Sequence, residues 1–204
     1  MVGIAAGKGQ DMTHRGVALD DPRNGLILAF LRPPVLTVEI VTARLLRAYR
    51  GKPPADLAQK VAHIMTRPQD SDKPASQSLD SVADSRMRLG THPDLVDRLW
   101  QLNAALPADC RWVVYGKPAL VHPETGVIFG HATGTLGYAL RLAEPARAEA
   151  DRLGAKTRIE IPNGDPYDLS EAGPEWRFGK WFEEEPGWCR TAYDSAGLQP
   201  ERSP

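Results

Sequence analysis

The hydrophobic periodicity of the chain changes at Leu106, and this change constrains the fold more than any other feature of the sequence. Before Leu106, apolar residues recur at spacings of three and four, which is the period of an amphipathic helix. After it, they gather in short segments rich in β-branched and aromatic residues, separated by turn residues, as in antiparallel strands. The sequence therefore predicts an α+β fold: an antiparallel β-meander sheet with helices packed on one face, plus a helical N-terminal part.

The clearest helical period lies in residues 37–51. Val38, Val41 and Leu45 share one face of this helix, and Thr37 is a suitable residue to cap its start. The other segments that we expect to be helical are residues 53–65, 79–89, 92–106, 144–154 and 183–197.

Short apolar segments with flanking turn residues predict the strands. These segments are residues 111–116, 118–122, 126–132, 137–143 and 157–162. The last one alternates, with Ile159 directed inward and Arg158 outward. The apolar run GLILAFL, residues 25–31, is interpreted as a further strand, because a turn-like segment precedes it and two prolines follow it.

The composition divides the chain into four parts. These are a loose N-terminal arm (residues 1–24), a small part with one strand and two helices (25–67), a linker (68–79) and an α+β core domain (80–197). The linker is predicted because residues 66–78 contain no large apolar residue. A chain of 204 residues is long enough to bury a core without disulfides or metals.

A glycine-rich stretch, residues 116–142, contains His122 and His131 among apolar residues. We interpret it as a β-meander in which the segment HPETGV forms a hairpin turn. At about 3.3 Å per residue, the two histidines then lie roughly 13 Å apart along the hairpin, too far to share one metal ion. Gly130 lies inside a strand and indicates a bulge, or the close approach of another backbone or a ligand. A patch at Lys117, Gly130 and His131 is therefore a candidate binding surface.

Large aromatic residues gather near the C-terminus, where Trp176, Phe178, Trp181 and Trp188 lie within thirteen residues. Such residues usually belong to a core, but their number also fits the wall of a ligand pocket, and both interpretations stay open. The candidate residues for binding a ligand or a partner are Lys117, His122, Gly130, His131, Arg141, Trp176 and Trp181.

The order of elements between residues 93 and 161 resembles a known kind of small domain. A predicted helix over residues 93–106 is followed by VVYGKPALV, GVIFGHA and GYALRL, and then by a short helix and another strand. This part, about a third of the chain, is similar to the α+β modules of the TfoX N-terminal and YjbR-like families. Those modules have a comparable Gly-Lys-Pro or Met-Phe-Gly entry, a G-x-x-F second strand and an L-x-L third strand. The resemblance implies the fold and a binding role, and it supplies no catalytic residues.

Charge is distributed unevenly, although the net charge of the whole chain is only −1. Residues 32–67 contain seven basic and two acidic residues, whereas residues 160–204 contain ten acidic and four basic residues. The basic helices of residues 37–65 are predicted to dock on the acidic region or, alternatively, to bind an acidic partner such as nucleic acid. The basic candidates are Arg44, Arg47, Arg50 and Lys52.

Motifs for catalysis are incomplete in this chain. In residues 3–12, GIAAGKGQDM, three residues instead of four separate the first glycine from Gly-Lys, and no Ser or Thr follows, so a P-loop is excluded. No G-x-S-x-G segment is present. Cys110 and Cys189 belong to no paired motif and are expected to be reduced and buried. No catalytic residue, metal or cofactor is therefore predicted.

The longest apolar run, GLILAFL, is too short to span a bilayer, and no secretory signal is recognised. We therefore expect a cytoplasmic, bacterial-type protein without a membrane partner. The predicted function is a non-catalytic binding or protein-interaction module. Two alternatives stay open. One is a small-molecule-binding protein or enzyme with an aromatic pocket near His131 and Trp181, and the other is a nucleic-acid binder that uses the basic helices of residues 37–65.

Overall fold

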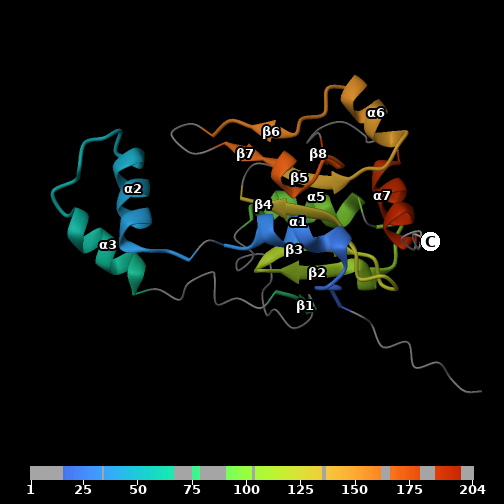
Figure 1. Cartoon of the computed structure of the whole chain (residues 1–204), viewed down its shortest axis with the longest axis horizontal. Coiled ribbons are helices and arrows are strands. Elements are labelled where there is room, and N and C mark those ends of the chain that lie inside the picture. The colour runs from blue at the N-terminus through green and yellow to red at the C-terminus, as the bar shows by residue number, and fades with distance from the viewer. Residues whose placement is uncertain are drawn as a thin grey trace, which may run out of the picture.

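A sheet forms the centre of the main body of the molecule, which comprises this sheet and the helices that cover it (Figure 1). The computed structural model describes residues 16–33, 35–66, 75–78, 91–102, 104–134, 137–161, 166–179 and 187–198. Within them the sheet has six strands, in the order β1–β2–β3–β4–β5–β8, and every neighbouring pair is antiparallel. The bounds are Gln77–Ser78 (β1), Arg111–Val114 (β2), Lys117–Val121 (β3), Ile128–Thr133 (β4), Gly137–Arg141 (β5) and Trp176–Phe178 (β8). The α+β class and the antiparallel sheet expected from the sequence are confirmed.

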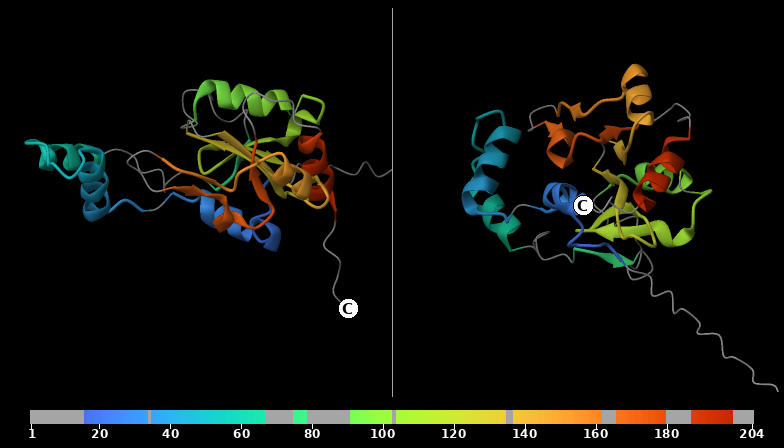
Figure 2. Two further views of the ribbon diagram at one scale, coloured as in Figure 1. Left: turned by 90° about the horizontal axis from the view of Figure 1, so that it is seen from above. Right: turned by 45° about the vertical axis from the view of Figure 1, so that its right-hand side comes forward.

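Helices cover both faces of this sheet, as Figure 2 shows from above. The helices are α5 (Pro93–Leu102) and α7 (Trp188–Gly197) on one face, and α1 (Pro22–Leu31) and the 3-10 helix η4 (Leu169–Ala172) on the other. Neighbouring residues of β5 belong to different cores, because successive strand side chains point to opposite faces. Leu140 packs with α5 and α7, and Ala139 with α1 and η4. The expectation of helices on a single face is corrected in this respect.

The segment GLILAFL is helical, whereas the sequence interpretation made it a strand. It forms most of α1, which begins at Pro22. The Asp21 side chain caps the helix by accepting a hydrogen bond from the Arg23 backbone N–H at 2.9 Å. Ile27 and Leu31, one helical turn apart, are fully buried against the sheet. A short apolar run fits a buried strand and a buried helix equally well, so its periodicity could not distinguish the two.

The helical state of this segment also moves the boundaries of the predicted parts. α1 belongs to the core of the main body, so residues 25–67 do not form one unit. Val17 is buried in the same core, and the Ala18 N–H donates to the Gly126 carbonyl at 2.9 Å. The predicted loose arm therefore does not include residues 16–24, and its residues 1–15 lie outside the described part of the chain.

Part of the predicted linker is a strand of the main sheet. In β1, Gln77 pairs with Val113 and Ser78 pairs with Trp112. Linker residues 68–74 and the helix predicted over residues 79–89 lie outside the described residues.

Two helices, α2 (Val38–Ala48) and α3 (Leu57–Met65), form a helical hairpin beside the main body (Figures 1 and 2). Both confirm the helices expected from the sequence. The Thr37 hydroxyl oxygen caps α2 by accepting a hydrogen bond from the Ile40 backbone N–H at 3.3 Å.

The hairpin, defined here as residues 35–66, has a small core. In this range, which the structure describes completely, the buried residues are Val41 of α2 and Val61 of α3. The core clusters of the main body contain no described residue of the hairpin. The hairpin is therefore a separate unit as far as its apolar packing is concerned.

Smaller elements extend the main body. They are η3 (Ala108–Cys110) before β2, the helix α6 (Ala146–Arg152), and a separate two-stranded sheet of β6 (Arg158–Ile159) and β7 (Tyr167–Asp168). The strand predicted over residues 157–162 therefore exists in part, but it pairs with β7 instead of the main sheet. No helix in the described parts of the chain combines the length and the apolar character needed to cross a bilayer.

Candidate functional site

His131 lies in the middle of β4 and faces α1. It pairs with Ala119 of β3 and Ala139 of β5, whose side chains belong to the core beneath α1. The neighbouring Gly130 pairs with Leu120, whose side chain belongs to the core on the opposite face. The pairing of β3 with β4 shifts by one residue directly after Leu120. This β-bulge determines which face of the sheet His131 occupies.

Aromatic rings surround His131 on that face. The ring of Trp176 from β8 lies 5.4 Å from the imidazole, and the ring of Phe30 from α1 lies 6.2 Å away, between centroids. Phe30 in turn contacts Tyr167 at 5.0 Å, and Tyr167 contacts Phe178 at 5.7 Å. We call these five residues the His131 cluster. They come from four different elements, so only the folded chain brings them together.

The His131 imidazole is neutral at ordinary pH. Burial lowers its pKa to about 3, and the positive charge of Lys117 acts in the same direction. Neither ring nitrogen has a hydrogen-bond partner among the described residues, and the same holds for Nε1 of the fully buried Trp176. Buried polar atoms in native proteins nearly always have a partner, so two adjacent exceptions mark this cluster as a candidate site.

Three other candidates near His131 have evident structural roles. Lys117 Nζ donates a hydrogen bond to the Leu31 carbonyl at 2.9 Å, at the end of α1 where a positive charge is favourable. A Cβ atom on Gly130 would lie 2.9 Å from Leu120 Cδ1, so the strand admits only glycine at this point without movement. Arg141 forms an ion pair with Glu175 at 2.9 Å.

His122 lies on the opposite face of the sheet from His131, against α7. Its ring contacts that of Tyr193 at 4.5 Å, and its Nδ1 accepts a hydrogen bond from the Thr125 backbone N–H at 3.4 Å. A Cβ atom on Gly197 would lie 2.8 Å from His122 Nε2, so the end of α7 packs closely on the ring. Burial lowers the pKa of His122. The two histidines are separated by the sheet and cannot bind one ligand together.

The structure adds two residues that the sequence interpretation missed, Phe30 and Tyr167. Phe30 lies in the run that was interpreted as a strand, and the helical state of α1 turns it toward His131. Tyr167 belongs to a two-residue strand that no periodicity indicates. Trp181, a candidate from the sequence, lies outside the described residues.

The four basic candidates lie on the hairpin, and all are exposed. Arg44 and Arg47 belong to α2, and Arg50 and Lys52 belong to the connection between α2 and α3. Arg50 has a φ of 53°, in the left-handed region, where the chain turns toward α3. The sequence therefore identified a basic surface, and the structure places it away from the His131 cluster (Figure 1).

Basic and apolar residues occupy different flanks of α2. Successive residues of an α-helix are rotated by about 100°, so the flanks can be assigned relative to the buried Val41. Arg44 and Arg47 fall on one side of Val41, and Val38 and Tyr49 fall on the other. Val38 is 53% exposed and Tyr49 is 42% exposed. On α2, the exposed apolar residues Val38 and Tyr49 therefore lie on a different flank from Arg44 and Arg47, and Lys60 of α3 lies close enough to Tyr49 to interact with it.

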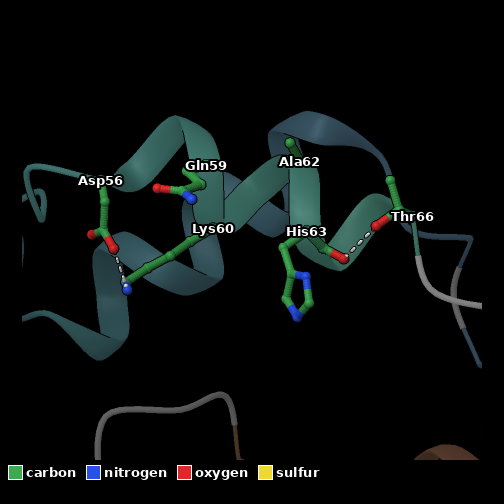
Figure 3. A pocket seen from close by; sticks show the side chains of 6 residues that line it. All are labelled: Asp56, Gln59, Lys60, Ala62, His63 and Thr66. Carbon is green, nitrogen blue, oxygen red and sulfur yellow. Dashed lines mark hydrogen bonds and ion pairs between the residues drawn. The ribbon is translucent and has the colours of Figure 1, made fainter.

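An open depression lies along α3 on the hairpin (Figure 3). The residues that line it are Asp56, Gln59, Lys60, Ala62, His63 and Thr66. Lys60 Nζ pairs with Asp56 at 2.6 Å, and the Thr66 hydroxyl donates to the His63 carbonyl at 2.9 Å. All six residues belong to one short segment, so no second element encloses the depression. It offers a contact surface and lacks the walls of a small-molecule site.

The described residues contain neither an evident metal site nor a reactive cysteine. No group of three or more His, Cys, Asp or Glu side chains is arranged there to hold a metal ion. Cys110 and Cys189 are buried and form no disulfide, as expected. Burial raises the pKa of the Cys110 thiol to about 12, which makes it a poor nucleophile.

Comparisons of the chain with family models, with curated proteins and with solved structures found no match. The resemblance of residues 93–161 to the TfoX N-terminal and YjbR-like modules therefore stays a prediction. The functional argument rests on the two surfaces described above, the His131 cluster and the hairpin.

Proposed function

We propose that this chain is a non-catalytic protein-interaction module that self-associates through the hairpin of α2 and α3. The observation that carries the proposal is the small core of the hairpin, where only Val41 and Val61 are buried within residues 35–66. Units shorter than about 40 residues usually need a disulfide, a metal or an oligomeric partner. Both cysteines of the chain lie in the main body. We infer that an oligomeric partner completes this core.

The position of the charges on α2 favours a second copy of the chain as that partner. Val38 and Tyr49 lie on one flank of α2, and Arg44 and Arg47 lie on the other. Two hairpins that pack through Val38 and Tyr49 leave Arg44 and Arg47 in solvent, so these like charges do not meet. The product is a four-helix bundle with two-fold symmetry, a common form of homodimer.

Other occupants of the hairpin need the basic flank instead. Docking of the acidic C-terminal region, or binding of nucleic acid, would engage Arg44 and Arg47 and would weaken steeply with salt. Apolar packing of two hairpins is insensitive to salt over the same range. The salt dependence of association, and the flank whose substitution prevents it, therefore distinguish the proposal from both alternatives.

The test is sedimentation equilibrium of the full chain at low and high salt. We expect a dimer under both conditions. The double variant Val38→Glu/Tyr49→Glu should be monomeric, because each charge placed in the interface weakens association by at least about tenfold. The matched control is Arg44→Ala/Arg47→Ala, which should remain dimeric. Both substituted positions of the first variant are about half exposed, so the fold of the monomer should survive.

Three outcomes contradict the proposal. A wild-type monomer at every concentration shows that the hairpin is stable without a second copy. A dimer that dissociates at high salt, or in the arginine variant, indicates docking through charge. Binding of a labelled DNA duplex by the wild type, lost in the arginine variant, favours the nucleic-acid alternative.

A further inference from the structure

The His131 cluster contains polar groups that the described residues do not satisfy. A neutral imidazole carries one N–H donor and one bare nitrogen acceptor, and an indole carries one N–H donor. In His131 and Trp176 none of these groups has a hydrogen-bond partner among the described residues. Both side chains are fully buried, so bulk solvent does not reach them. The two rings are only 5.4 Å apart, which makes the unsatisfied groups one cluster.

Packing alone gives no reason for a histidine at this position. The residues paired with it across the sheet, Ala119 and Ala139, are small and apolar, and the side chains facing it from α1 and β8 are the aromatic Phe30 and Trp176. An apolar side chain of similar size would fill the same space without an unsatisfied group. A buried polar group that lowers stability in this way is typical of functional sites, where the group serves binding or catalysis.

The surroundings of these nitrogens favour a negatively charged acceptor. Among the described residues, the charged group that acts on His131 is Lys117, and it is positive. A protonated His131 offers two N–H donors, and Trp176 offers a third. The two imidazolium N–H groups point away from each other, so one carboxylate can accept a hydrogen bond from one of them and a second from the Trp176 N–H. The remaining members of the cluster, Phe30, Tyr167 and Phe178, suit an aromatic body attached to that carboxylate.

We propose that the His131 cluster binds a small aromatic carboxylic acid, with His131 and Trp176 donating hydrogen bonds to its carboxylate. His131 is neutral without the ligand, so its bare nitrogen takes up one proton from water when the carboxylate arrives. The negative charge of the ligand stabilises the imidazolium, and no covalent bond forms. The site lies in the main body and does not depend on self-association of the hairpin.

The first part of the test measures binding by calorimetry with phenylacetate as the probe. We expect saturable binding that tightens by up to tenfold for each unit of pH lowered between pH 7.5 and pH 6, because one proton is taken up. The control ligand is 2-phenylethylamine, which has the same ring with a positive charge and should not bind. Absence of phenylacetate binding, or equal binding of the amine, overturns the proposal.

The second part identifies the residue that takes up the proton. Nitrogen-15 NMR of the imidazoles should show His131 neutral in the free protein and protonated in the presence of phenylacetate. His131→Leu and, separately, Trp176→Phe should abolish binding or weaken it by at least tenfold, and His63→Gln on the hairpin is the matched control. Trp176→Phe keeps the test decisive if the histidine variant does not fold. Binding without a change at His131, or unchanged binding in both variants, overturns the assignment.

Discussion

Three buried polar side chains of the main body differ sharply in how they are satisfied. Asn24 forms three hydrogen bonds, to the Ala18 and Gly126 carbonyls and from the Ile128 N–H, at 2.8–2.9 Å. His122 accepts one from a backbone N–H, and its ring packs against Tyr193 of α7. His131 has no partner among the described residues. Asn24 and His122 therefore have roles in the architecture, whereas His131 requires a different explanation.

The neutral state of His131 predicts a specific dependence of stability on pH. Its pKa is about 3 in the folded protein, against about 6.5 for an unperturbed histidine. Between these values the unfolded chain binds a proton that the folded chain does not. The free energy of unfolding should therefore fall as pH decreases below 6.5, with a slope approaching about 1.4 kcal/mol per pH unit from this residue.

Urea denaturation of the wild type and of His131→Leu between pH 5 and 7 measures this slope. The plot of the free energy of unfolding against pH should be less steep for His131→Leu, because the contribution of His131 is removed. The control His63→Gln, at an exposed position, should keep that contribution. At pH 7, where both states are neutral, the leucine variant should be more stable by about 1–3 kcal/mol, because it removes buried groups without partners. A destabilised leucine variant at pH 7 would mean that the imidazole nitrogens are satisfied structurally.

At the scale of elements, α1 is the helix on which the His131 cluster depends most. It covers one face of the sheet, and it places Phe30 next to His131. Its start is held by the Asp21 cap and by Asn24, which joins the helix to the turn between β3 and β4. Its end is held by Lys117 through the Leu31 carbonyl. The position of Phe30 in the His131 cluster thus depends on contacts at both ends of one helix.

Removing the Asn24 side chain should loosen this attachment. Asn24→Ala leaves the buried Ile128 N–H without its acceptor, which is expected to lower the free energy of unfolding by about 1–3 kcal/mol. The matched control, Leu26→Ala, changes a residue of the same helix that is 58% exposed and should stay within about 0.5 kcal/mol of the wild type. Chemical denaturation measures both changes. Equal effects in the two variants would contradict the role assigned to Asn24.

At the scale of the whole molecule, the chain consists of a main body with two cores and a hairpin with almost none. The cores on the two faces of the sheet are built from α1, α5, α7, η4 and the strands. The hairpin lies to one side of the sheet in each of the views (Figures 1 and 2). Its five basic and two acidic residues, within residues 35–66, also distinguish it from the remainder of a chain whose net charge is −1. Stability and self-association should therefore be separable.

Deletion of the hairpin tests this separation. Replacing residues 35–66 with a flexible glycine-serine linker should leave the main body folded, with a thermal midpoint within a few degrees of the wild type. The same protein should be monomeric in sedimentation equilibrium. A large fall in the midpoint, or loss of a cooperative transition, would show that the hairpin contributes to the main body.

The sequence by itself determined the elements whose signals are local. A helical period with a capping threonine predicted α2, and short apolar segments between turns predicted β2 to β5. Both depend on hydrogen bonds and side chains close together in the chain. The sequence also identified His131, Trp176 and the basic hairpin as candidates. A histidine among apolar residues, a group of large aromatic residues and a group of basic residues are each visible in the sequence.

Tertiary structure decided the rest. The run GLILAFL became a helix because an apolar segment of this length takes the state that best covers the sheet. The bulge after Leu120 placed His131 opposite Ala119 instead of Pro118 and so determined its face. Phe30, Trp176 and Tyr167 approach His131 from separate elements, and the burial that keeps the imidazole neutral arises only from that assembly. Such properties depend on residues far apart in the chain, which no local pattern encodes.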